Sequence, residues 1–137
     1  MAVSTMPNTA RAAAARARYV TDTVETVSPQ RLVTMLYDAL VRDLTLAEEA
    51  LGGRPDLRVV NDRLVHAQAI VLELQAGLDP TKWSGGPGLA RLYNYLHDEL
   101  VKSNVEKSAM RVVACRLLVE PLQQAWHEAA ATMAAAG

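Results

Sequence analysis

At 137 residues, half of them apolar, the chain is long enough for one domain with one core and too short for two ordinary domains. Fourteen basic and fifteen acidic residues give a net charge of −1, which provides no general attraction for nucleic acid or an anionic membrane. A single cysteine excludes an internal disulfide, and no apolar run approaches the roughly eighteen residues of a membrane span. The sequence therefore predicts a cytoplasmic protein without a nucleic-acid partner or membrane insertion.

The composition and the N-terminal residues indicate how the chain is organised. Ala, Leu and Val dominate the apolar residues and Phe is absent, which favours an all-α fold. Residues 1–18 carry three arginines and no acid. Their apolar run is too short for a secretory signal; a mitochondrial targeting peptide fits better, but a flexible or nascent-helical arm is favoured. Residues 19–27 are β-branched and polar, which predicts an irregular segment before the helices of a single domain over 19–137.

The best-defined helix is predicted over residues 28–51. Ser28 can cap its first turn, and Pro29 suits the first helical position because its missing N–H would have no partner there. Gly52 and Gly53 end it. Its apolar residues recur at steps of three and four and form a face too broad for one neighbour, so a second helix, a third helix or a bound peptide must cover it.

Three further helices are predicted downstream, and their short connections favour an antiparallel four-helix bundle. They run from residue 57 to 75 or 76, from 89 to 103 or 104, and from about 108 to 134. Gly77 and Asn104 are expected to end the first two in the left-handed conformation. Pro121 is expected to kink or break the last helix, because proline removes a hydrogen bond and clashes with the preceding turn. The apolar stripe predicted for that helix comprises Met110, Val113, Leu117, Leu118, Leu122, Ala125, Trp126 and Ala129.

The sequence does not favour catalysis or metal binding. Metal-binding bundles use Glu-x-x-His, but Arg63, Asn94 and Gln124 stand three residues before the three histidines, which are predicted to lie at the surface. Cys115 lies in an apolar turn and is predicted to be a buried thiol rather than a nucleophile. The glycines of residues 85–88 lack the Lys-Ser or Lys-Thr of a phosphate loop and predict a flexible connector. No catalytic residue, cofactor or metal site is therefore predicted.

Some apolar residues exceed what a four-helix core needs. Tyr19 lies outside the helices, Trp83 lies in a predicted loop, and the helix faces are broad. This surplus predicts a surface for a partner, although the same residues could simply fill the bundle.

The order of the motifs resembles one family. The segment from Tyr19 to Pro29, YVTDTVETVSP, followed by Leu32 and by MLYD over residues 35–38, closely resembles the N-terminal signature of the FliS family of flagellar secretion chaperones. Further residues match in family order: Ala67, Gln68, Ile70, Glu73, Leu74, Leu78, Asp79, Leu89, Leu92, Tyr93, Tyr95, Leu96, Asn104, Leu122 and Trp126. Ala39, where the family usually has glycine, and Pro121, where it has an ordinary helix former, depart from the pattern.

The resemblance implies a non-enzymatic chaperone of the bacterial cytosol. It would bind the disordered C-terminal segment of flagellin in an apolar groove, prevent premature polymerisation and deliver the flagellin to a component of the flagellar type III export gate. An apolar groove suits such a client, because an amphipathic segment can fold as it binds. The alternative is a structural bundle that buries its surplus apolar face in a homodimer, so we expect a monomer or a weak homodimer.

The broad face of the 28–51 helix is expected to contribute to both core and groove. Residues 19–27 are expected to form a lid over the groove when no client is bound, because their apolar side chains cannot make a core of their own and an empty groove exposes apolar surface. The resemblance implies the same movement for this segment. The residues expected to bind the client or form the lid are Tyr19, Val24, Leu32, Met35, Leu36, Tyr37 and Leu40.

Overall fold

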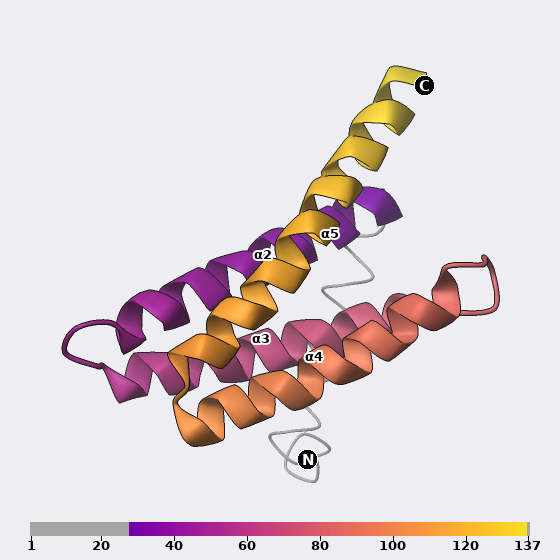
Figure 1. The fold of residues 1–137 in the computed structure, drawn as a ribbon. Helices are drawn as coiled ribbons and strands as arrows, with labels where there is room; N and C mark the ends of the chain where they lie inside the picture. Colours follow the sequence, from indigo (N-terminus) through magenta and orange to yellow (C-terminus); the bar gives the residue numbers. More distant parts are fainter. Residues whose placement is uncertain (1–27, 137) are drawn as a thin grey trace, which may run out of the picture. The chain divides into compact units, whose positions relative to one another are not determined.

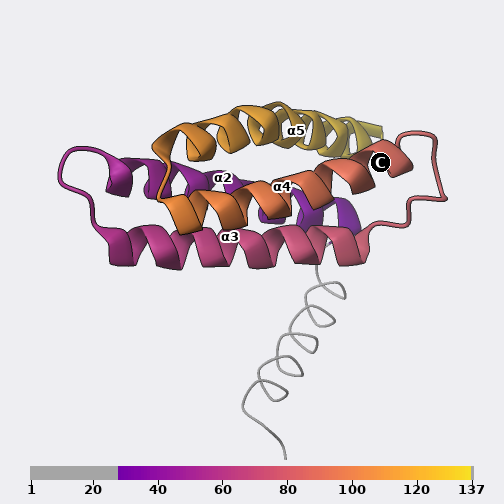
Figure 2. The ribbon, with the colours of Figure 1, turned by 60° about the horizontal axis from the view of Figure 1, so that its bottom comes forward.

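A computed structural model describes residues 28–136, and the four helices in this part of the chain form an all-α antiparallel bundle (Figure 1). The helices are α2 (Pro29–Leu51), α3 (Leu57–Gly77), α4 (Gly86–Glu106) and α5 (Ala109–Ala136). The chain reverses at each connection, and α3 and α4 lie side by side in both views (Figures 1 and 2). The predicted antiparallel four-helix bundle is confirmed. The arm predicted over residues 1–18 and the irregular segment over 19–27 lie outside the described residues.

The α2 helix begins and ends where the sequence predicts. The Ser28 hydroxyl accepts a hydrogen bond from the backbone N–H of Arg31 at 3.2 Å, which satisfies one of the free donors of the first turn. After Leu51 the chain turns at Gly53, whose φ of +57° is left-handed and costs a glycine little. The Ser28 cap and the double glycine are therefore adequate start and stop signals.

The predicted ends of α3 and α4 are wrong in detail. The α3 helix extends through Gly77 and is closed by Leu78, whose extended backbone donates its N–H to the Gln75 carbonyl at 3.2 Å. In α4, Lys107 rather than Asn104 takes the left-handed conformation, at φ 52° and ψ 47°. Asn104 stays helical, with its side-chain amide bonded to Asn61 of α3 at 2.9 Å. Contact with the neighbouring helix thus carries α4 past its predicted end.

The core is built from one face of each helix within residues 33–136. Its largest fully buried apolar side chains are Tyr37, Leu40 and Leu44 from α2, Val60, Leu64 and Val71 from α3, Leu96 and Leu100 from α4, and Val112 and Val119 from α5. Leu122 and Trp126 of α5 are half-buried and pack against this cluster. Interdigitated apolar contacts of this kind supply most of the stability of a bundle.

The stripe predicted to face the core on α5 is wrong for its first half. The buried residues there are Val112, Cys115 and Val119, whereas Met110 is 83% exposed and Leu117 is 60% exposed. Apolar residues occur all round this part of α5, so residue spacing is compatible with more than one inward face. The burial of Val112, Cys115 and Val119 identifies the face that α5 turns to the core.

The α5 helix also passes through Pro121 without a break. Proline removes the hydrogen bond to the carbonyl four residues earlier, which belongs to Leu117. Both residues are exposed, so water can solvate that carbonyl. The expected interruption therefore does not occur, because the lost hydrogen bond lies on the solvent side of the helix.

Asp43 of α2 is a buried carboxylate, only 1% exposed, and α3 supplies both of its side-chain partners. Its Oδ1 accepts a hydrogen bond from Arg63 Nη1 at 3.3 Å, and its Oδ2 lies 2.5 Å from His66 Nδ1. A buried charge is costly unless it is paired, and these contacts satisfy both oxygens. Both partner side chains reach solvent, so the cluster joins α2 to α3 at the edge of the core.

We predict that the double variant Arg63→Met/His66→Leu lowers the free energy of unfolding by about 3 kcal/mol, because it leaves the Asp43 carboxylate buried without its partners. Denaturant unfolding followed by circular dichroism measures the change. Arg58→Met, an exposed position on the same helix, is the matched control and should shift stability by about 0.5 kcal/mol or less. Equal stability of the double variant and this control would show that Asp43 does not depend on α3.

Candidate functional site

A cleft of about 460 Å³ lies between α4 and α5, and apolar side chains surround much of it. Tyr95 contributes from α4, and Met110, Ala114 and Leu118 contribute from α5. Tyr95 is 51% exposed and Leu118 is 42% exposed, so these apolar groups are open to water. Val101, Val105 and Leu117 add exposed apolar surface on the same two helices. We call this cleft the α4–α5 groove. Exposed apolar surface gathered in one place is typical of a binding site.

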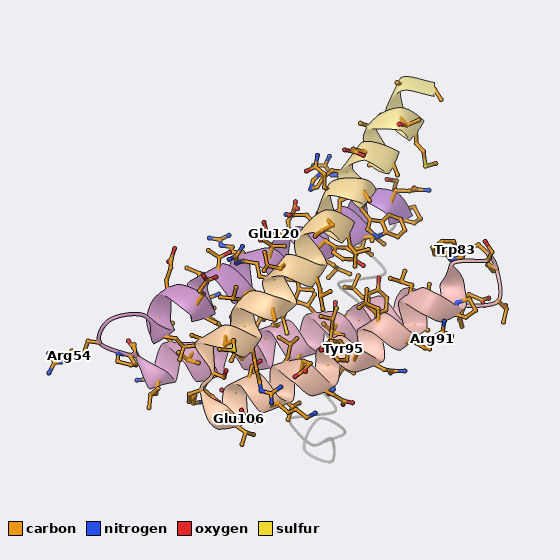
Figure 3. The ribbon with its side chains drawn as sticks, in the orientation of Figure 1. Arg54, Trp83, Arg91, Tyr95, Glu106 and Glu120 are labelled. Carbon is orange, nitrogen blue, oxygen red and sulfur yellow. The ribbon has the colours of Figure 1, made fainter. Side chains whose placement is uncertain are left out.

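A short connection positions the two sides of the groove. Lys107 reverses the chain in the left-handed conformation, and the Ser108 hydroxyl caps α5 by accepting a hydrogen bond from the Arg111 N–H at 3.2 Å. The last turn of α4 is thereby held beside the first turn of α5. Tyr95 and Glu106 both belong to α4, Glu106 being its last residue before this connection (Figure 3).

Arg111 ties the two helices together electrostatically. Its Nη1 donates to Glu99 Oε2 at 2.8 Å, and its Nε donates to Glu106 Oε1 at 3.1 Å. These two carboxylates raise the pKa of Arg111, and the hydrogen bond that Arg111 donates to Glu106 is the largest cause. A hydrogen bond to Glu99 raises the pKa of Tyr95, which keeps its hydroxyl protonated. The groove is therefore apolar with one charged network inside it.

Cys115 lies at the base of the groove and is buried, as predicted. Burial raises the pKa of its thiol to about 11, with a smaller contribution from the negative charge of Glu99. Nucleophilic cysteines need the thiolate, which is scarce near neutral pH when the pKa is this high. The environment of Cys115 therefore suits packing rather than covalent chemistry.

The structure distributes the sequence-predicted site residues over different environments. On α2, Met35 is 43% exposed, Leu32 and Leu36 are half-buried, and Tyr37 and Leu40 are fully buried. Tyr19 and Val24 lie outside the described residues. Sequence reasoning did not identify Tyr95, Met110 and Leu118 as a groove. In the sequence, Tyr95 only matches a position of the family pattern. Met110 and Leu118 are predicted to belong to one apolar stripe on the last helix.

The two buried tyrosines form a polar contact inside the core. The hydroxyls of Tyr37 on α2 and Tyr93 on α4 are 2.7 Å apart, and the Tyr37 ring stacks on Trp126 of α5 with centroids 6.3 Å apart. Burial raises the pKa of both phenols. Both rings therefore remain neutral at physiological pH, and each hydroxyl supplies the other with a partner that a buried polar group needs. This contact links three of the four described helices.

We predict that Tyr93→Phe lowers the free energy of unfolding by about 1 kcal/mol, because the Tyr37 hydroxyl then stays buried without a hydrogen-bond partner. The double variant Tyr37→Phe/Tyr93→Phe should cost less than the sum of the single variants, since it removes both polar groups. Chemical denaturation of the unmodified protein, the two single variants and the double variant gives the coupling energy between the two hydroxyls. Tyr95→Phe, at an exposed tyrosine of the same helix, should leave stability nearly unchanged. Strict additivity would show that the two hydroxyls do not interact.

The remaining candidate groups do not assemble into a reactive centre in the described part of the chain. His66 and His127 are exposed, and His127 Nε2 lies 2.6 Å from Asp38 Oδ1. Among residues 28–136, no three His, Cys, Asp or Glu side chains come together as a metal ion would require. None of the described helices is long and apolar enough to cross a membrane.

Two of the glycines predicted to form a flexible connector serve close packing. A side chain on Gly85 would come within 2.1 Å of the Trp83 ring, and one on Gly86 would come within 2.5 Å of the Pro80 carbonyl oxygen. Gly86 needs glycine for space because it meets the Pro80 backbone, whereas the atoms near Gly85 belong to the side chain of Trp83. The connector between α3 and α4 is compact at this point, and Trp83 itself remains 52% exposed.

The described residues define a helical-bundle protein with an exposed apolar groove between α4 and α5. The sequence model of the family described as flagellar protein FliS matches residues 11–133, and the chain belongs to that family. The chain is also 26% identical over 111 residues to the flagellar secretion chaperone FliS of Bacillus subtilis (strain 168), an alignment that covers 81% of this chain and 82% of that protein. The family resemblance seen in the sequence is confirmed.

Proposed function

We propose that the protein is a cytosolic, non-enzymatic chaperone of flagellar export that binds the disordered C-terminal segment of flagellin. Membership of the FliS family and the name of the Bacillus relative support this role. The observation that carries it is the α4–α5 groove, where Tyr95, Met110 and Leu118 present apolar surface to water. Occupying this groove masks the client surface that would otherwise polymerise, until the complex reaches a component of the export gate.

The groove suits a segment that folds as it binds. An amphipathic helix could lay its apolar side chains between α4 and α5, where each Å² of apolar surface removed from water contributes about 25 cal/mol. The client loses conformational entropy when it becomes ordered, which offsets part of that gain. Binding of this kind is specific yet reversible, as a chaperone that must release its client requires.

The α2 residues extend the proposed site. Met35 is exposed, and Leu36 and Leu32 are half-buried, so all three retain apolar surface that a long client segment could cover. Tyr37 and Leu40 are fully buried, and their proposed role is to hold α2 in place beneath that contact. Residues 19–27, with Tyr19 and Val24, are proposed on sequence grounds to be a lid that competes with the client.

We predict that Leu118→Asp weakens binding of a flagellin C-terminal peptide at least about tenfold, because a carboxylate in the groove must lose water when the client covers it. Isothermal titration calorimetry of the full chain measures the affinity and the expected one-to-one stoichiometry. The matched control is Leu72→Asp on α3, which makes the same change at an exposed leucine outside the groove. Both variants should unfold like the unmodified protein.

Three other outcomes would contradict this prediction. Equal affinity of the two variants would exclude the α4–α5 groove as the client site. Loss of stability in Leu118→Asp would show that Leu118 belongs to the core. If the unmodified protein does not bind the peptide and sediments as a dimer, the apolar surface serves self-association, and the homodimer alternative is correct.

We predict that deleting residues 1–24, which spares the Ser28 cap, raises the binding of a hydrophobic dye. The deletion should tighten the affinity for the flagellin peptide or leave it unchanged, because a competing lid reduces the fraction of molecules that can bind. Dye fluorescence and peptide titration of the deleted and complete chains provide the comparison. Weaker peptide binding by a deleted protein with unchanged circular dichroism would instead place this segment within the binding site.

A further inference from the structure

The charges in the α4–α5 groove do not cancel. Glu99 and Glu106 place two carboxylates beside the single guanidinium of Arg111, which leaves one excess negative charge among the described residues that line the groove. Lys107 lies at the nearby turn, but its Nζ is 2.5 Å from Asn104 Oδ1 and the residue does not line the groove. An apolar segment with no charge would leave this excess unpaired when it displaces water.

Glu106 is the carboxylate able to accept a further partner. Its side chain is 52% exposed and receives one hydrogen bond from Arg111 Nε, whereas the Glu99 side chain is only 16% exposed. A carboxylate has about four lone-pair sites, so the contact with Arg111 leaves acceptor capacity at Glu106. The available charge therefore lies at the outer edge of the groove.

The groove is also polarised along its length. Tyr95 and Leu118 lie at the end remote from the helix connection, and Glu106 and Arg111 lie at the connection, because α4 and α5 are antiparallel. Glu106 follows Tyr95 by eleven residues, which corresponds to about 16 Å along α4. Apolar side chains line both ends, since Met110 lies beside the connection, but the exposed carboxylate of Glu106 lies at the connection end alone.

We propose that the α4–α5 groove selects a client segment in which apolar side chains at one end are accompanied, about three helical turns away, by a basic side chain that pairs with Glu106. The apolar end supplies binding energy, and the basic residue determines which way round the segment lies. This inference rests on the proposed function and specifies the chemistry of the segment that the groove accepts.

Two synthetic amphipathic helical peptides test the proposal with the full-length protein. They share one apolar face and differ only in carrying lysine or glutamine about eleven residues from the first apolar anchor. The lysine peptide should bind about three- to fivefold more tightly at low salt, a preference expected of a partly exposed ion pair. The preference should shrink at about 1 M salt, where the Debye length falls to about 3 Å.

Variants identify the carboxylate responsible. Glu106→Gln should abolish the preference for lysine, and it keeps the fold because Arg111 retains its bond to Glu99. Glu106→Lys should reverse the selection and favour a third peptide with glutamate at the same position. Asp98→Asn removes an exposed carboxylate of α4 outside the groove and should leave the preference unchanged.

The failures of the two proposals can be told apart. Equal affinity of the unmodified protein for the lysine and glutamine peptides would overturn this inference alone, as would a lysine preference that survives Glu106→Gln. An unmodified protein that binds neither these peptides nor the flagellin C-terminal segment would overturn the proposed function together with this inference.

Discussion

The rotational setting of α5 is the constraint on which the α4–α5 groove depends. Arg116 places its Nε 2.8 Å from Glu48 of α2 and also pairs with Glu120, while Arg111 bonds to two carboxylates of α4. In the helix held by these contacts, Val112, Cys115 and Val119 are buried, and Met110 and Leu118 are exposed. Because α5 is apolar on several sides, hydrophobicity alone would stabilise more than one rotation of this helix. The ion pairs join α5 to α4 and to α2 in the rotation that the structure shows.

The sequence predicts a helix boundary well where the residues that set the boundary lie close to it in the chain. Ser28, Pro29 and Gly53 act within a few residues of chain, so α2 could be placed almost to the residue. The end of α4 could not, because Asn104 is held helical by Asn61 of another helix. The predicted break at Pro121 does not occur for a similar reason, since the effect of a proline depends on whether the affected carbonyl faces water or protein.

In the candidate site, too, some features follow from residues near in the sequence and others depend on neighbouring helices. The breadth of the apolar face on α2 was visible in the sequence, but its separation into buried Tyr37 and Leu40 and exposed Met35 required knowledge of the neighbouring helices. The groove was harder to find, because it joins side chains from two helices and depends on the rotation of α5. Family membership was recognisable from ordered motifs even so, since a motif match does not require knowing which way a side chain points.

The residues that line the groove are also close together in the sequence. All of its lining residues lie between Tyr95 and Leu118, on two helices joined by the tight turn at Lys107. Closing so short a loop costs little chain entropy, so this helical hairpin can assemble through short-range contacts. The Asp43 cluster and the tyrosine contact, by comparison, tie α2 to segments far away in the sequence. The lining of the groove is therefore local in the chain, whereas α2 is held by contacts between distant segments, among them the pair that Glu48 makes with Arg116 of α5.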